Sequence, residues 1–215
     1  MKQILLSTIV FFIAITTFAS DYYDATVMLV NGKSRKGLVE STLSTEYILF
    51  KASKDAKEEK IESATVSSVI FKIKNETREF HILKVYLGWG QKRISDPMWL
   101  RVVEKGIATL YVNATTMSSQ NGLNTAGFQD YYVIRAGEPA AKMIANVSSV
   151  NNNQTFRAKA PQYFQDYPQL AEKIKSKEYT WKDLTLVVQE YNKWRRKRSN
   201  TFWRRVNCNH AMQYS

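Results

Sequence analysis

Hydrophobic and polar positions alternate with a period of two through much of the chain, from about residue 25 to residue 135. Alternation over short segments rich in β-branched and aromatic residues predicts strands with one buried face. Seven segments fit this pattern: 25–30, 45–51, 66–73, 79–86, 98–103, 107–112 and 131–135. Because no helical period separates them, we expect an antiparallel sheet curled into a barrel or a sandwich.

The polar runs between these segments predict how the strands are joined. Residues 31–37 and 74–77 contain the Gly and Asn that suit tight hairpin connections, and residues 88–97 combine Gly with Pro. The run 52–62 carries charges of both signs, which is typical of a solvated hairpin tip. Residues 113–127 are rich in Asn, Ser and Thr and predict a long loop, either mobile or used for binding.

The period changes to that of a helix after residue 160. In the segment 166–177, Asp166 is a candidate N-cap and Pro168 falls in the first turn, where its missing N–H costs nothing. The segment 180–194 begins with Thr180 and places four apolar residues at helical spacing: Leu184, Val187, Val188 and Tyr191. Two amphipathic helices with a short link predict an αα-hairpin whose apolar stripe docks on the sheet.

The chain therefore divides into five predicted parts. Residues 1–20 form a leader, residues 21–145 a β-rich domain, residues 146–160 a polar linker, residues 161–198 the helical hairpin and residues 199–215 a basic, aromatic tail. The predicted fold class is α+β, mainly β.

Two segments carry a pattern beyond their periodicity: 163–194, YFQDYPQLAEKIKSKEYTWKDLTLVVQEYNKW, and 27–39, VMLVNGKSRKGLV. The first has a dipeptide-Pro-x-Leu helix start, an Ile-Lys-x-Lys stop and a terminal Tyr-Asn pair, and the second is an opening β-hairpin. Together they resemble uncharacterised exported proteins of the Bacteroidota, in which a C-terminal helical segment follows a β-rich region. The resemblance implies export and this order of elements. It assigns no activity and no role to any residue.

The leader indicates the compartment. Lys2 precedes an apolar run over 4–15, and small residues follow, which is typical of a secretory signal peptide. The run is shorter than the roughly 20 residues of a membrane-spanning helix, and no later segment is long enough to span a bilayer. The only Cys, Cys208, is too far from the leader to carry a lipid anchor. We expect a periplasmic, outer-membrane-associated or extracellular protein.

Residues that could carry chemistry are sparse. Cys208 and His210 supply at most two metal ligands, and His81 alternates with apolar neighbours in a predicted strand, so no metal site is expected. The sequence has no nucleophile motif, no P-loop and no dinucleotide fingerprint, and we expect neither an enzyme nor a cofactor. Trp89 and Trp99 flank a Gly- and Pro-containing turn, where burial in the core is favoured over stacking on a sugar or peptide.

Four sequons begin at Asn75, Asn113, Asn146 and Asn153. Asn-rich polar loops produce such triplets by chance, and we assign them no chemical role.

Charge gathers near the C-terminus. The chain has a formal net charge of +12, and no Asp or Glu follows Glu190. The basic candidates for an anion-binding site are Lys193, Arg195, Arg196, Lys197, Arg198, Arg204 and Arg205, and Trp194 and Trp203 are candidates for aromatic contact. If the helix ends near Arg198, cations in its last turns are favoured by the helix dipole and need no ligand. The residues after Arg198 gain no such benefit, so they predict an anionic partner.

We therefore expect an exported, non-enzymatic interaction module whose basic C-terminus contacts anionic components of the cell envelope or another envelope protein. A hydrolase acting on an envelope or extracellular polymer stays an alternative, because carboxylates distant in sequence can meet in space. Nucleic-acid binding is the third interpretation. Export and the lack of a recognisable nucleic-acid-binding motif disfavour it.

Overall fold

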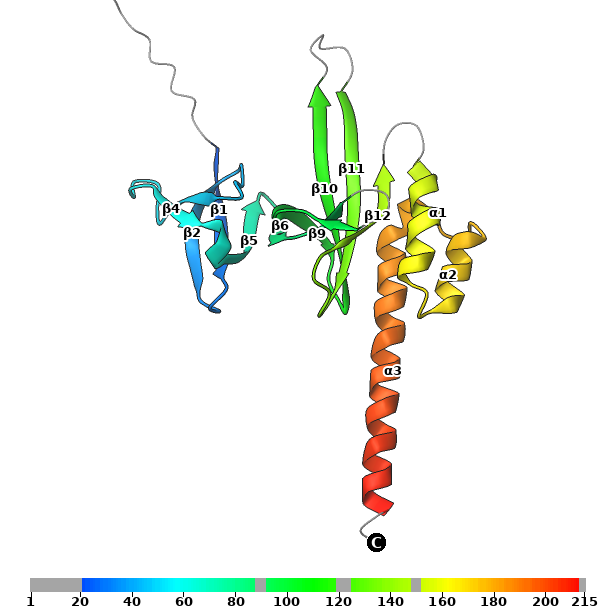
Figure 1. The fold of residues 1–215 in the computed structure, drawn as a ribbon. Helices are drawn as coiled ribbons and strands as arrows, with labels where there is room; N and C mark the ends of the chain where they lie inside the picture. Colours follow the sequence, from blue (N-terminus) through cyan, green and yellow to red (C-terminus); the bar gives the residue numbers. More distant parts are fainter. Residues whose placement is uncertain (1–20, 88–91, 119–124, 148–151, 213–215) are drawn as a thin grey trace, which may run out of the picture.

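The computed structural model describes residues 21–87, 92–118, 125–147 and 152–212, and for 114–118, 125–128, 152 and 200–212 it describes the backbone alone. The predicted signal peptide lies outside these residues. Figure 1 shows a twisted sheet with helices packed at one end and the last helix running away from the body.

Ten strands form one antiparallel sheet in the order β12-β11-β10-β9-β6-β5-β1-β2-β3-β4. Their bounds are β1 Tyr22–Leu29, β2 Ser34–Glu40, β3 Tyr47–Lys51, β4 Glu59–Glu62, β5 Val66–Ile73, β6 Glu76–Leu83, β9 Met98–Glu104, β10 Ala108–Ser118, β11 Thr125–Arg135 and β12 Lys142–Val147. A separate pair is formed by β7 Tyr86–Leu87 and β8 Arg93–Ile94. The predicted mainly β, antiparallel fold is confirmed. The sheet is curled but is not closed into a barrel.

All seven predicted segments overlap strands. Periodicity did not predict β2, β4 or β12, and β2 was indicated only by the resemblance of 27–39 to an opening hairpin. The segment of β2 is Ser-Arg-Lys-Gly-Leu-Val-Glu, and the segment of β4 is Glu-Lys-Ile-Glu, so neither has the expected apolar alternation. Strand β4 lies at the edge of the sheet, where charged residues discourage pairing with other chains. The other edge, β12, packs against the first helix.

The predicted loop over 113–127 is wrong for 113–118 and 125–127, and residues 119–124 lie outside the described residues. Strand β10 continues to Ser118 and β11 begins at Thr125, and the two pair in register from Ala108 opposite Arg135 to Ser118 opposite Thr125. Thr is compatible with strands, and a continuous ladder satisfies the backbone polar groups that a loop would leave to water. The pair forms the long hairpin that rises above the sheet in Figure 1.

The shorter connections follow the predictions more closely. Lys74, with φ 54°, and Asn75 form the turn between β5 and β6. The turn between β1 and β2 contains Gly32, with φ 81°, and ends before Ser34, so only the first half of residues 31–37 is a turn. The predicted charged tip is a loop up to Glu58, after which β4 begins.

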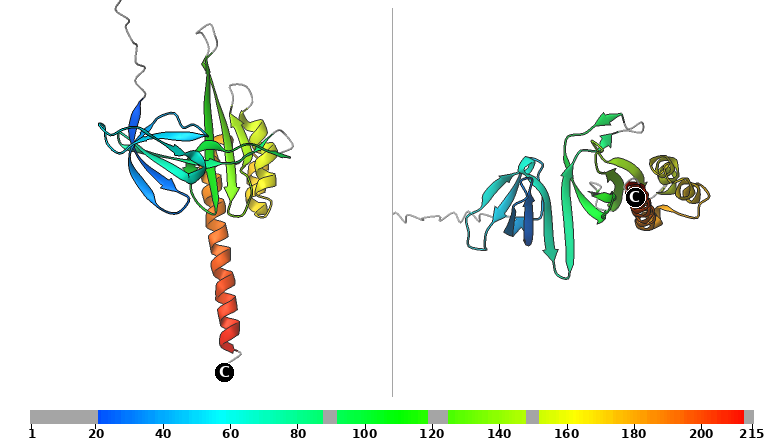
Figure 2. Two further views of the ribbon diagram at one scale, coloured as in Figure 1. Left: turned by 60° about the vertical axis from the view of Figure 1, so that its left-hand side comes forward. Right: turned by 90° about the horizontal axis from the view of Figure 1, so that it is seen from below.

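Three apolar clusters stabilise the sheet. An N-terminal core fills the curl of β1 to β5 and includes Val27, Val39, Ile48, Phe50, Val69 and Phe71. A helix-side core joins the sheet to the helices and includes Leu110, Val133, Ile144, Phe156, Phe164 and Tyr191. A third cluster contains Val85, Leu100, Tyr111, Tyr132 and Ala141. Figure 2 (right) shows the N-terminal strands and the helix-bearing strands as two curled halves that β5, β6 and β9 connect.

Three helices follow the sheet: α1 Asn152–Tyr163, α2 Pro168–Lys175 and α3 Leu184–Met212. The predicted linker over 146–160 is therefore helical from Asn152 onward. Helix α1 has no clear apolar stripe because its apolar residues are few. Phe156 and Ala160 are nevertheless buried in the helix-side core. Tertiary packing, which the local pattern does not show, stabilises this helix.

The predicted starts of α2 and α3 are partly correct. Pro168 is the first residue of α2, but Tyr167, and not Asp166, is the N-cap. Thr180 forms the expected capping box: its hydroxyl accepts from the backbone N–H of Lys182, and the Asp183 carboxylate accepts from the backbone N–H of Thr180. A short 3-10 turn, Trp181–Asp183, leads from this cap into α3.

Tyr191 and Asn192 anchor α3 to the rest of the molecule. The Tyr191 hydroxyl donates to Asp166 Oδ2 at 2.8 Å. The Asn192 side chain, 1% exposed, accepts from the Ala108 N–H at 2.8 Å and donates to the Ala108 carbonyl at 2.9 Å. These contacts hold the helix on the sheet at the start of β10.

Candidate functional site

The basic stretch lies on helix α3, and this helix is much longer than the sequence predicts. It continues beyond Arg198 to Met212, which is about four more turns. Figure 1 and Figure 2 (left) show its C-terminal half extending past the sheet and the other helices, with no other element beside it.

This length removes the dipole explanation for the basic residues up to Arg198. The favourable effect of cations falls off within the last turn of a helix. Residues 193–198 instead lie near the middle of α3, and the prediction that the helix ends near Arg198 is wrong. Like charges such as Lys193 and Lys197, four residues apart, weaken a helix by about 0.2–0.5 kcal/mol per pair. The helix dipole therefore does not account for the charge in this stretch.

The structure places the candidate cations in three groups. The side chains of Lys193, Arg196 and Lys197 are exposed. Arg195 and Arg198, together with Ile107 and Ser199, line a hollow of about 340 Å³ beside the turn that joins β9 and β10. Arg204 and Arg205 lie on α3 beyond the residues whose side chains are described, as does Trp203.

Arg195 contacts the body of the protein, and Arg198 lies over a ring of its own helix. Arg195 lies 3.8 Å from the Asp166 carboxylate, and the Arg198 guanidinium lies 5.0 Å from the centre of the Trp194 ring. Both cations stay exposed, and only the Arg195 contact links α3 to the preceding helices.

Trp194 has a contact within the chain. Its ring stacks on Tyr167 with the centroids 4.5 Å apart and the planes 2° from parallel, and it also lies 5.7 Å from the ring of Tyr191. It is half-buried against the helix-side core. Trp194 thus supports the root of the projecting helix, and the anion-binding hypothesis depends on the cations around it.

A second polar network holds the root of α3. Glu190 accepts hydrogen bonds from Tyr179 at 2.6 Å, Tyr167 at 3.2 Å and the Lys173 ammonium at 3.2 Å. Burial alone would raise the pKa of Glu190, but the hydrogen bonds from Tyr179 and Lys173 lower it below the usual value. This acid is therefore ionised at neutral pH, and it ties α2 and the following turn to α3.

The lowered pKa predicts how stability depends on pH. The folded state binds a proton at Glu190 less readily than the unfolded state does. The ionised Glu190 therefore stabilises the fold above its ordinary pKa of 4.5, and this stabilisation is lost as the pH falls through the lowered pKa. We expect E190Q to be less stable than the native chain at neutral pH and the difference to shrink at an acid pH below 4.5. Urea denaturation at both pH values measures this, and E172Q, at an exposed position of α2, should show no such change.

Other clusters of titratable groups have structural explanations. His81 Nε2 lies 2.7 Å from Glu79 and Nδ1 lies 2.9 Å from the Tyr111 hydroxyl. Burial tends to raise the pKa of Glu79, but Lys105 and His81 lower it overall, so this carboxylate is ionised at neutral pH. Within the described ranges, no group of three or more His, Cys, Asp or Glu is placed to hold a metal ion.

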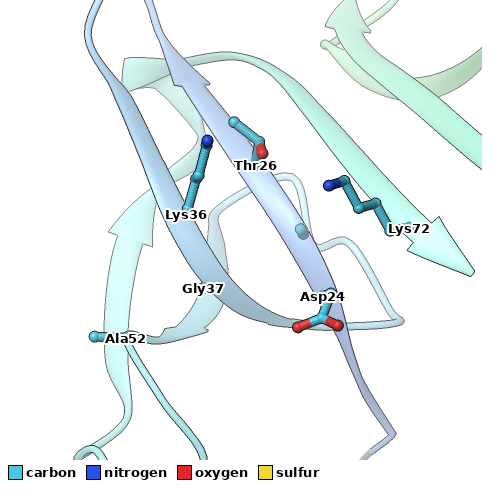
Figure 3. A pocket seen from close by; sticks show the side chains of 7 residues that line it. Asp24, Thr26, Lys36, Gly37, Ala52 and Lys72 are labelled. Atoms are coloured by element: carbon cyan, nitrogen blue, oxygen red, sulfur yellow. The ribbon is translucent and has the colours of Figure 1, made fainter.

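A hollow of about 330 Å³ lies on the outer face of β1, β2 and β5 (Figure 3). Asp24, Lys36 and Lys72 line it with Thr26, and all four project from the same side of the strands. Glycoside hydrolysis uses two carboxylates, and this hollow contains one. The hydrolase alternative gains no support from it.

Trp99 packs partly against the N-terminal core, and its Nε1 donates to the Ser44 carbonyl at 2.8 Å. Trp89 lies outside the described residues. Among the helices that the structure describes, none is both long and apolar enough to cross a membrane.

Comparison of the chain with protein-family models, with curated proteins and with solved structures finds no match. The functional argument therefore depends on the geometry of this chain alone.

Proposed function

We propose that the protein is an exported, non-enzymatic module of the cell envelope that binds a phosphate-bearing lipid surface through the basic part of α3, residues 193–205. The observation that carries the proposal is the continuation of α3 through the whole basic stretch. The cations lie along a projecting helix, with the body of the protein at one end.

The charge distribution supports a phosphate surface as the partner. Every Asp and Glu of the chain lies at or before Glu190, so the projecting half of α3 carries positive charge only. An anionic membrane surface attracts a nearby basic segment by about 1 kcal/mol per Lys or Arg. Binding would also relieve the repulsion between neighbouring cations along the helix.

The leader favours a lipid surface over nucleic acid. Residues 1–20 have the pattern of a signal peptide, and an exported protein meets lipid phosphates more often than DNA. Nucleic-acid binding stays the alternative, because the same cations can contact the phosphates of a duplex.

The test measures sedimentation of the chain from Asp21 onward with phosphatidylcholine vesicles that contain or lack phosphatidylglycerol. We expect binding only to the anionic vesicles, and weaker binding at raised salt. The triple variant K193Q/R196Q/K197Q should bind at least tenfold more weakly. These three side chains are exposed, so their replacement leaves the folded body intact.

The matched control is K33Q/K54Q/K57Q, which removes the same charge from exposed positions of the β region. It should bind as the native chain does. A chain that ends after Ser199 is a second test, because it lacks Arg204 and Arg205 but keeps Trp194 and its stack on Tyr167. Equal binding by both triple variants, or tighter binding to duplex DNA than to the vesicles at the same salt, would contradict the proposal.

A further inference from the structure

One face of the sheet is covered at its two ends and open in the middle. Directly paired residues of an antiparallel sheet share a face. A row of paired residues therefore crosses five strands on one face: Val69 in β5, Phe80 in β6, Arg101 in β9, Val112 in β10 and Tyr131 in β11. Val69 belongs to the N-terminal core, and Tyr131 packs against the helix-side core.

A hollow of about 370 Å³ occupies the middle of this row. Its floor contains Phe80, Arg101 and Val112. Arg78 and Trp99 also line it, each two residues before Phe80 and Arg101 on the same strands. The connection between β2 and β3 forms one side and contributes Ser41 and Leu43, and Asn113 of β10 completes the lining. The volume is within the range of about 300–1,000 Å³ that is typical of small-molecule sites.

Arg101 is the cation at the centre of this hollow, and it is half-buried. All Asp and Glu residues lie in the described part of the chain, and none of them forms an ion pair with Arg101. Arg135, which is also half-buried, pairs with Asp166 at 3.1 Å. A cation withdrawn from water without an anion is costly, and a planar guanidinium matches a carboxylate through two parallel hydrogen bonds.

The aromatic residues of the hollow are held in place. The hydrogen bond from Trp99 Nε1 to the Ser44 carbonyl fixes the indole, and Phe80 packs edge-on against Phe71 with centroids 5.8 Å apart. Both rings stay half-exposed. Fixed aromatic surface supplies contact area for a flat ligand face at a low entropic cost.

The remaining groups define the charge and polarity of the ligand. The lining contains two Arg and no Asp or Glu. Arg78 already pairs with Glu76 at 2.9 Å, so Arg101 is left as the cation that an anionic ligand would neutralise. Ser41 offers a hydroxyl group that can bond to the hydroxyls of a ligand.

From these observations we infer that the hollow is a binding site for an acidic saccharide, a sugar ring that carries a carboxylate. The carboxylate pairs with Arg101, the ring lies against Trp99 and Phe80, and a hydroxyl bonds to Ser41. The site is on the sheet and does not depend on lipid binding by α3.

The test is a titration of the isotope-labelled chain from Asp21 onward with D-glucuronate, D-glucose and inorganic phosphate, followed by amide and indole N–H resonances. Glucuronate should shift the resonances of Trp99 and Arg101, with at least tenfold higher affinity than glucose. R101Q should lose at least tenfold in affinity for glucuronate. R93Q, at an exposed position of β8, should bind as the native chain does.

The variant R101K keeps the charge but not the two-pronged geometry, and it should also bind weakly. Comparison of R101K with R101Q separates the effect of the pairing geometry from the effect of the charge. The amide spectrum of each variant shows whether it is folded. Equal affinity for glucose and glucuronate, or native affinity in both folded Arg101 variants, overturns the inference. Binding of phosphate at the same residues with affinity equal to that of glucuronate overturns the assignment to a sugar acid.

Discussion

Replacing Asn192 by alanine should lower the free energy of unfolding by about 2–4 kcal/mol. The substitution removes two hydrogen bonds and leaves both the N–H and the carbonyl of Ala108 buried without a partner. Each unsatisfied buried group costs about 1–3 kcal/mol. Urea denaturation monitored by circular dichroism measures the loss.

Two further variants make this prediction specific. A methyl group on Gly106 would collide with the Asn192 side-chain amide, so G106A should destabilise the protein through the same contact. Q189A, on the same helix, removes one hydrogen bond from an exposed side chain to Glu104 and should stay within about 0.5 kcal/mol of the native chain. An N192A chain as stable as Q189A would show that Asn192 does not anchor α3.

Replacing Phe156 by alanine should cost about 3–5 kcal/mol, the usual range for a buried aromatic ring. Phe156 is fully buried between the sheet and the helices. The variant should retain α2 and the β-rich half but unfold at a lower urea concentration. This outcome distinguishes a packed helix α1 from the polar linker that the sequence predicts over 146–160, because truncation of a linker side chain is nearly neutral.

The matched control for this prediction is Q154A. Gln154 lies on the same helix and is exposed, so its truncation should change stability by less than about 0.5 kcal/mol. Equal effects of F156A and Q154A would mean that α1 does not contribute to the helix-side core.

The sequence predicts elements well where one local rule decides them. Segments such as 66–73 and 98–103 were recognisable as strands because they are short and rich in β-branched and aromatic residues. The start of the last helix was also predictable, since the capping box from Thr180 to Asp183 is a contact between near neighbours. Strand β4 has one buried residue, Ile61, which is too little to produce a pattern.

The candidate site was predicted only as a set of residues. The sequence indicates that Lys193, Arg196 and Lys197 are cations without acids after them, but it does not show that the helix continues beyond Arg198. Helical and irregular segments with weak periodicity look alike in sequence. The sequence did not identify Arg101 as a binding residue. Its place in the hollow results from strand pairing with Phe80 and Val112, which are distant in the chain.

The sequence by itself determined the mainly β region, the helices after it and the location of the charge. These features depend on the order of residues within about ten positions, which periodicity and composition record directly. Only the tertiary structure decided how Asn192 attaches α3 to β10, which face of the sheet stays open around Arg101 and how far α3 extends from the body. Those features arise from contacts between distant residues, and such contacts leave no local pattern when a single polar side chain makes them.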